Sequence, residues 1–185
     1  MKNPKLAKRY AKALFDFAKE KEEIESVNQD LVSIRKALKE NSELRVILNS
    51  PVIAPSKKHT IFSNVFENAI SKTTFIFLDV IIRKKREPAL DSICEEYVNL
   101  YNEFHNIKVV TLTTAQALSE ELVEEIRKMI AEQTQHSIII KQVVQPEIIG
   151  GIMVKMDDFY FDASVISKIN KLKQEFAHNI YQVNF

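Results

Sequence analysis

The sequence contains very little glycine, cysteine or proline. Glycine occurs only twice in 185 residues, as the adjacent pair Gly150 and Gly151, and proline occurs five times. Because both residues interrupt helices and open turns, their scarcity predicts long helices joined by short connections. The single cysteine, Cys94, excludes an intramolecular disulfide framework and any multi-cysteine metal site. Its predicted helix face also carries Leu90 and Tyr97, so we interpret Cys94 as a buried structural thiol.

An excess of one charge and long apolar runs are also missing. The 26 basic side chains nearly balance 25 acidic ones, and the net charge of +1 does not favour electrostatic binding of nucleic acid. The most apolar window, Phe75–Ile82, has about half the length that a bilayer span requires. The basic start of the chain enters a helix pattern with no apolar signal core before it. We therefore expect a cytoplasmic protein with no membrane span.

Residues up to about His105 show helical periodicity throughout. Apolar side chains recur at intervals of three and four residues in six segments, which predicts a compact six-helix bundle over residues 1–105. Ser56 is expected to cap the fourth helix, and Pro88 to open the sixth. The fifth helix, Lys72–Lys85, is apolar nearly all round. Such a helix is either central in its bundle or has a second partner.

From Ile107 the apolar pattern becomes typical of strands alternating with helices. Strands are predicted at residues 108–113, 137–144, 148–156 and 159–161. Two helices are predicted as well, one capped by Ser119 and one capped by Asp162 or Ser164. The order β-α-β-β-β-α indicates an α+β domain over residues 106–185, with two helices on a small sheet. The predicted fold class is therefore mainly α with a small α+β second domain.

The two glycines fall inside one of these predicted strands. They are followed by Ile-Met-Val and not by Lys-Ser or Lys-Thr, so the pair is not a phosphate-binding loop. We interpret Gly150 and Gly151 as a bend in the sheet, or as backbone packed too closely for a Cβ atom. Asp157 and Asp158 are expected to form the tight turn of the next hairpin.

Few residues in the sequence suggest a chemical function. The four histidines are widely separated, and none has a second ligand three or four residues away, so we predict no metal site. They are His59, His105, His136 and His178. Asp157, Asp158 and Asp162 could bind Ca²⁺ or Mg²⁺, but they lack the spacing of a calcium loop, and we interpret them as turn and capping residues. Without a catalytic triad, nucleotide loop or acid–base pair, we predict no enzymatic activity and no cofactor.

Three stretches of the sequence carry a family resemblance. They are RYAKALFDFA (Arg9–Ala18), PVIAPSKKHTIF (Pro51–Phe62) and PEIIGGIMVKMDDFYFDASV (Pro146–Val165). In this combination and order, the whole chain resembles the delta subunit of bacterial F-type ATP synthases, the relative of the mitochondrial oligomycin-sensitivity-conferring protein. Ala163 departs from the family pattern, which usually has glycine there. The residues of the last stretch that we single out as its structural motif are Pro146, Gly150, Gly151, Asp162 and Ser164.

The resemblance implies a non-catalytic stator subunit. In the family, the amino-terminal bundle sits on the catalytic alpha-beta hexamer and holds the amino-terminal helix of an alpha subunit between its first and fifth helices. The carboxy-terminal domain joins the carboxy-terminal ends of the peripheral-stalk b subunits. The chain would then couple rotor torque to ATP synthesis at the cytoplasmic face of the bacterial inner membrane, touching the membrane only through the complex. By hypothesis the groove contains Tyr10, Ala13, Leu14, Phe17, Ile76, Phe77, Val80 and Ile81.

Two other classes of protein remain open on the residues themselves. One is a helical scaffold associated with nucleic acid, which would use the basic run Arg83–Arg86 and the basic face of the first helix. The simpler interpretation of that run is that its cations offset the negative carboxy-terminal end of the fifth helix. The other class is an enzyme with a site around Asp157–Asp162, which would require a concave pocket there.

Overall fold

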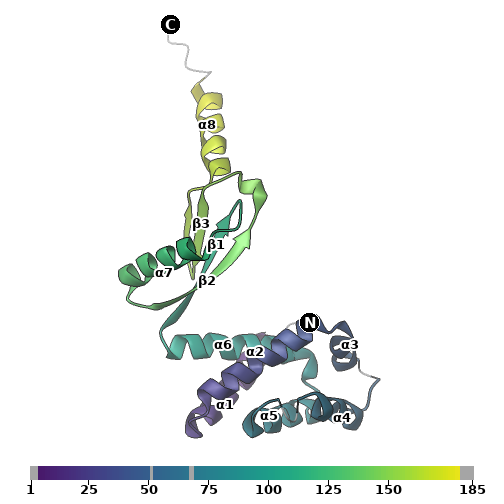
Figure 1. Ribbon diagram of the computed structural model, residues 1–185. Helices are drawn as coiled ribbons and strands as arrows, with labels where there is room; N and C mark the ends of the chain where they lie inside the picture. Colours follow the sequence, from purple (N-terminus) through teal and green to yellow (C-terminus); the bar gives the residue numbers. More distant parts are fainter. Residues whose placement is uncertain (1–3, 51, 67–68, 180–185) are drawn as a thin grey trace. The chain divides into compact units, whose positions relative to one another are not determined.

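A computed structural model of the chain describes residues 4–50, 52–66 and 69–179 (Figure 1). Pro51, the first residue of the second family-like stretch, therefore lies outside the described residues. The chain divides into two compact units, residues 1–105 and 106–185. The first is helical and the second contains a four-stranded sheet, so the predicted class, mainly helical with a small α+β part, is confirmed. Among the described residues, no helix is both long enough and apolar enough to span a bilayer.

The helical unit is built around the contact between its first and last helices. Its elements are α1 (Pro4–Glu20), α2 (Ile24–Glu40), α3 (Ser42–Asn49), α4 (Pro55–Phe66), α5 (Lys72–Arg83), the 3-10 helix η1 (Glu87–Ala89) and α6 (Leu90–Phe104). The buried face of α1 is rich in alanine, which lets α6 approach closely. There the ring of Phe15 lies 5.6 Å from those of both Tyr97 and Phe104, and Cys94 is fully buried beside them on α6.

Several predicted helix ends are wrong by a few residues. The fourth helix begins at Pro55 and not after Ser56, because proline suits the first helical turn, where its missing N–H is not needed. The fifth ends at Arg83, since Lys85 adopts a left-handed backbone with φ of 55°. Pro88 is the second residue of the short helix η1, which begins at Glu87, and α6 starts only at Leu90.

A buried ion pair joins three elements of the helical unit. Lys58 Nζ of α4 donates to Glu87 Oε1 of η1 at 2.5 Å and to the Leu48 carbonyl at the end of α3 at 2.8 Å. The two side chains are only 4% and 5% exposed. Because burying either charge without its partner is costly, the pair fixes α4 against the connection that leads into α6. The sequence pattern did not predict this contact.

The second unit is a mixed four-stranded sheet with two helices. Its elements are β1 (Ile107–Thr114), α7 (Glu120–Thr134), β2 (Ser137–Val144), the 3-10 helix η2 (Pro146–Ile148), β3 (Ile152–Met156), β4 (Phe159–Asp162) and α8 (Val165–Asn179). The strand order is β2-β1-β3-β4, with β1 parallel to β2 and the other neighbours antiparallel. Val110 and Leu112 of the central strand β1 are fully buried. Ser119 caps α7 as predicted, accepting a hydrogen bond from the Leu122 N–H.

The glycine pair lies before β3 and not inside a strand as predicted. Gly151 has φ of 77°, and a Cβ atom on it would lie 2.3 Å from the Ala163 carbonyl oxygen. The expectation of backbone packed too closely for a side chain is therefore confirmed, but the place is the turn that follows η2. Here the chain before β3 meets the chain that leaves β4, and the Val165 N–H donates to the Gly150 carbonyl at 2.9 Å.

The prediction that two helices cover the sheet differs from the structure for α8. This helix packs against η2, and the side chains of residues 170–177 are exposed. Its start is fixed locally, because the Ser164 hydroxyl accepts from the Ser167 N–H at 3.3 Å and Asp162 accepts from the Ser164 N–H at 2.8 Å. Both capping residues proposed from the sequence therefore act together.

Replacing Gly151 by alanine should destabilise the second unit. The left-handed backbone and the clash with the Ala163 carbonyl together should cost roughly 2 kcal/mol or more. Hydrogen exchange of β1 and β3 amides in the full chain measures the effect. Gly150→Ala is the matched control, because its Cβ would meet only the movable Val165 side chain at 3.3 Å. Equal effects of the two substitutions would contradict the close approach at Gly151.

Replacing Lys58 by methionine should destabilise the helical unit by roughly 3–5 kcal/mol, because a buried carboxylate loses its partner. Urea unfolding followed by far-ultraviolet circular dichroism measures this loss. The double variant Lys58→Met with Glu87→Leu should recover most of the stability, since no charge is then left buried. A double variant as unstable as the single one would show that packing, and not charge, dominates at this position.

Candidate functional site: an apolar groove between α1 and α5

The helical unit has an apolar groove between α1 and α5, with a volume of about 250 Å³. Four lining residues come from α1 and four from α5. They are Tyr10, Ala13, Leu14 and Phe17, and Thr73, Ile76, Phe77 and Val80. The small residues Ala13 and Thr73 leave room between larger side chains, and none of the described lining residues carries a carboxylate, amine or imidazole. This surface, called the α1–α5 groove below, can therefore bind a partner by shape and apolar contact but has no group for acid–base or nucleophilic chemistry.

The groove exists because each helix has more apolar surface than the core covers. On α5, Leu78, Ile81 and Ile82 are buried, whereas Ile76 and Val80 on the neighbouring strip are 48% and 40% exposed. Residues three and four apart share a helix face, so the two strips run side by side along the helix. The all-round apolar pattern of this helix was compatible with a central position in the bundle or with a second partner, and the structure leaves the second strip exposed.

Polar contacts with α2 fix the position of α5 and hence one wall of the groove. Asp30 Oδ2 of α2 accepts from the Ser71 N–H at 2.9 Å and from the Thr74 hydroxyl at 2.7 Å. Ser71 is also the N-cap of α5, with its hydroxyl accepting from the Thr74 N–H. Because the cap and the carboxylate hold the first turn together, the direction in which Ile76 and Val80 point is set by the fold.

The structure brings together seven of the eight residues expected to contain the groove. Ile81 is the exception, because it is fully buried in the core and does not line the groove. Leu14 lies at the floor and is itself almost fully buried. Thr73 was missed, although its spacing of three residues from Ile76 and seven from Val80 places it on the same helix face.

Cations lie over two aromatic rings of the α1 wall. The Arg9 guanidinium is 5.5 Å from the centre of the Tyr10 ring, and Lys21 Nζ is 6.0 Å from that of Phe17. Such contacts contribute about 0.5–1 kcal/mol at exposed sites. The wall thus has charged side chains at its edge and apolar ones inside, as in many protein interfaces.

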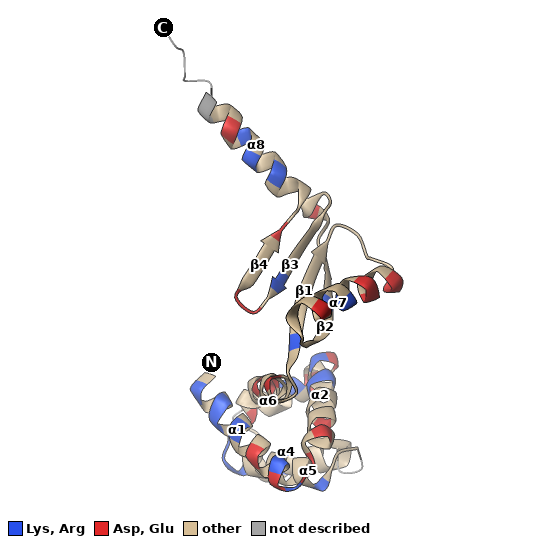
Figure 2. Cartoon of the chain, turned by 90° about the vertical axis from the view of Figure 1, so that its left-hand side faces the viewer, with Lys and Arg blue, Asp and Glu red and all other residues tan. Residues whose placement is uncertain are grey.

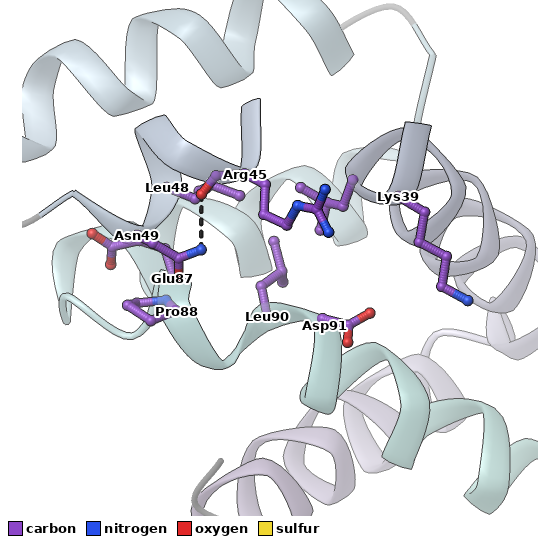
Figure 3. Close-up of a pocket in the computed structure, with 9 residues that line it drawn as sticks. Lys39, Arg45, Leu48, Asn49, Glu87, Pro88, Leu90 and Asp91 are labelled. Carbon is purple, nitrogen blue, oxygen red and sulfur yellow. Dashed lines mark hydrogen bonds between the residues drawn. The ribbon is translucent and has the colours of Figure 1, made fainter. Parts of the chain in front are cut away.

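A second cavity of about 240 Å³ lies among α2, α3, η1 and α6 (Figure 3). Charged side chains line it, but its two acids already have partners. Glu87 pairs with Lys58, and Asp91 accepts from Arg35 at 3.1 Å. The Asn49 side chain donates to the Arg45 carbonyl at 2.8 Å, the hydrogen bond drawn in Figure 3. We interpret these groups as structural.

The other residues considered from the sequence are engaged in structure. Burial raises the pKa of the Cys94 thiol to about 12, so this cysteine is no nucleophile near neutral pH. Asp157 lies in the two-residue turn between β3 and β4 and accepts from Lys108 at 2.6 Å. Hydrogen bonds from Ser167 and Ser164 lower the pKa of Asp162, which keeps the helix cap charged. The enzyme alternative requires a pocket at this turn, and neither the α1–α5 groove nor the cavity among α2, α3, η1 and α6 includes it.

The histidines and the basic run form no site either. Among the described residues, no group of three metal-ligating side chains converges, and the His178 side chain lies outside that description. In the basic run, Arg83 pairs with Asp79 at 2.8 Å at the end of α5. His59 faces the same carboxylate at 3.4 Å. This arrangement fits cations at a helix carboxy-terminus, and nothing in it favours the nucleic-acid alternative.

Comparison with known proteins gives a consistent relationship over nearly the whole chain. The family model described as "ATP synthase delta (OSCP) subunit" matches residues 6–176. The ATP synthase subunit delta of Cytophaga hutchinsonii is 32% identical over 97% of this chain and 98% of the relative. That of Bacillus thuringiensis is 34% identical over 97% of this chain and 99% of the relative. A chain in the cryo-EM structure of the Toxoplasma gondii mitochondrial ATP synthase has the same fold, with a TM-score of 0.76 at 22% identity over 93% of this chain and 97% of that one. The chain therefore belongs to the ATP synthase delta (OSCP) subunit family.

Proposed function

We propose that the α1–α5 groove holds an amphipathic helix, the amino-terminal helix of an alpha subunit in the catalytic hexamer. As a member of its family, the chain is a non-catalytic component of the peripheral stalk of F-type ATP synthase. The observation that carries the proposal is the groove itself, in which Ile76 and Val80 face Tyr10 and Phe17 without a covering element among the described residues. A bound helix would insert apolar side chains at intervals of three and four residues.

The depth and composition of the groove support a helix more than a small ligand. The lining side chains come from two helices and form an elongated apolar strip, and Ala13 and Thr73 leave spaces for large partner side chains. A small molecule would normally require several convergent polar groups to fix its orientation. Only the hydroxyl groups of Tyr10 and Thr73 are available here, so recognition would depend on the spacing of apolar anchors.

We further propose that the second unit joins the carboxy-terminal ends of the b subunits. The support is its exposed apolar surface, which includes Phe159 and Phe161 on β4 and Leu172 and Phe176 on α8. Exposed apolar patches of this kind commonly mark interaction sites. In the assembled enzyme the protein would lie at the cytoplasmic face of the inner membrane and reach the membrane only through the complex.

With one partner on each unit, the protein acts as a mechanical link. The two interfaces lie in series between the catalytic hexamer and the stalk, so each must resist the torque that the rotor applies to the hexamer. A contact of nanomolar affinity corresponds to about 12 kcal/mol, which an interface of ordinary size reaches with a few aromatic or aliphatic hot spots. The helical unit would therefore act by holding the hexamer still, with no chemical step of its own.

Replacing Val80 by aspartate should weaken binding of a peptide with the alpha subunit's amino-terminal helix by about 30-fold or more, since a hot-spot loss is about 2 kcal/mol or more. Isothermal titration calorimetry with the full chain measures it. Val65→Asp on α4 is the matched control, because Val65 is 51% exposed and lies outside the groove. Unchanged binding by Val80→Asp, or loss of its helical circular-dichroism signal, would show that the groove is wrongly assigned.

The same Val80→Asp substitution in the assembled enzyme should separate ATP hydrolysis from ion transport. The hexamer keeps its catalytic sites, so hydrolysis continues, but a hexamer without its stator link turns with the rotor and transport falls. Parallel assays of ATP hydrolysis and ATP-driven proton uptake in membrane vesicles test this. If both activities fall together, the substitution has disturbed assembly or catalysis, and the mechanical interpretation fails.

A further inference from the structure

Helix α8 is the least supported element of the second unit. It has 15 residues, Val165–Asn179, and packs against η2 at its start. The capping hydrogen bonds of Ser164 and Asp162 fix its first turn. Beyond that turn the side chains are mostly exposed. A helix of about this length is marginal in water on its own, so α8 needs contact along its side to be stable.

One side of α8 carries an apolar seam. Ile169, Leu172 and Phe176, called the α8 seam below, follow one another at intervals of three and four residues. Leu172 is 52% exposed and Phe176 is 69% exposed. This spacing is the one by which two helices pack along their length, and nothing among the described residues covers the seam.

The charges around the seam are mostly positive. The described part of the helix carries three lysines and a single acid, Glu175 (Figure 2). The lysines are Lys168, Lys171 and Lys173. None of the four takes part in an ion pair among the described residues. At about 100° per residue, Lys168 and Lys173 lie on the two flanks of the seam, whereas Lys171 lies toward the opposite side.

We propose that α8 pairs with an acidic amphipathic helix, which packs its apolar residues on the α8 seam and sets carboxylates against Lys168 and Lys173. The inference rests on the proposed function, since such a helix would belong to the stalk partner of the second unit. Beyond that function, the inference specifies that α8 is the binding element, that the partner helix is acidic, and that Lys168 and Lys173 select it. Opposite charges on both flanks fix the register of two packed helices and disfavour basic partners.

A second copy of the chain is the main alternative occupant. Helix α7 is acidic, with Glu120, Glu121 and Glu124 near its start, and Leu122 and Met129 on it are exposed. It could therefore meet α8 of another molecule. Such a contact between copies would form a closed dimer or an open chain of molecules. We favour a separate partner because the seam and its two flanking lysines together match one acidic amphipathic helix, and sedimentation of the free chain distinguishes the two occupants.

The experiment uses the full chain and two synthetic helical peptides with the same leucine seam, one flanked by glutamates and one by lysines. The Val80→Asp background is used because it should weaken any binding of the peptides in the α1–α5 groove. At low salt the glutamate peptide should bind about tenfold or more tightly than the lysine peptide. Leu172→Asp with Phe176→Asp should abolish binding. Lys168→Glu with Lys173→Glu should reverse the preference, whereas the control Lys171→Glu should keep it.

Three results would overturn the inference. The first is equal binding of the two peptides, and the second is a Lys171→Glu effect as large as that of the flanking pair. The third is concentration-dependent sedimentation of the free chain that Leu172→Asp abolishes, which would identify a second copy as the occupant. Capture of the b subunit separates the two proposals. If the Leu172→Asp, Phe176→Asp variant still captures it, only the role of α8 is refuted. If the unchanged protein does not capture it, the proposed stalk contact itself is refuted.

Discussion

The helical unit depends on the division of α5 into two adjacent apolar faces. One face, with Leu78 and Ile81, completes the core, and the other, with Ile76 and Val80, forms a wall of the α1–α5 groove. A rotation of α5 by a single residue position, about 100°, would move Val80 toward the core and remove that wall. The hydrogen bonds of Asp30 to the first turn oppose such a rotation. The groove is therefore a consequence of how the core is packed.

The two candidate binding surfaces are built in different ways. The groove has walls on two helices that the core and the hydrogen bonds of Asp30 to α5 hold in place, so a partner loses little free energy in ordering it. Helix α8 is held mainly by its cap and by η2, so a partner must also stabilise the helix along its length. The first contact should favour a rigid match of shape, and the second should tolerate adjustment during assembly.

Much of the fold could be predicted from the sequence, because periodicity reports which faces are apolar. Periodicity predicted helices over residues 1–105 and a change to alternating strands and helices from Ile107. It also showed that the fifth helix is apolar nearly all round. Periodicity does not say which of two apolar faces meets the core, so Ile81 was assigned to the groove although it is buried. Lys58 and Glu87 lie far apart in sequence, and no periodic pattern in the sequence indicates which charged residues form a pair. The glycine turn before β3 was misplaced for a similar reason, since Gly151 is constrained by the distant Ala163 carbonyl.

The composition of the groove has a consequence if, as proposed, a partner helix binds there in an enzyme that works beside an energised membrane. Because none of its described lining residues carries a carboxylate, amine or imidazole, its central contacts contain no group whose charge ordinarily changes near neutral pH. Salt screens charges but hardly affects buried apolar surface, so swings in ionic strength also leave such a contact nearly unchanged. The affinity of such a contact should fall at low temperature, because apolar association weakens on cooling. If the groove holds the hexamer as proposed, its apolar lining would make that contact independent of the ion gradient that the enzyme uses.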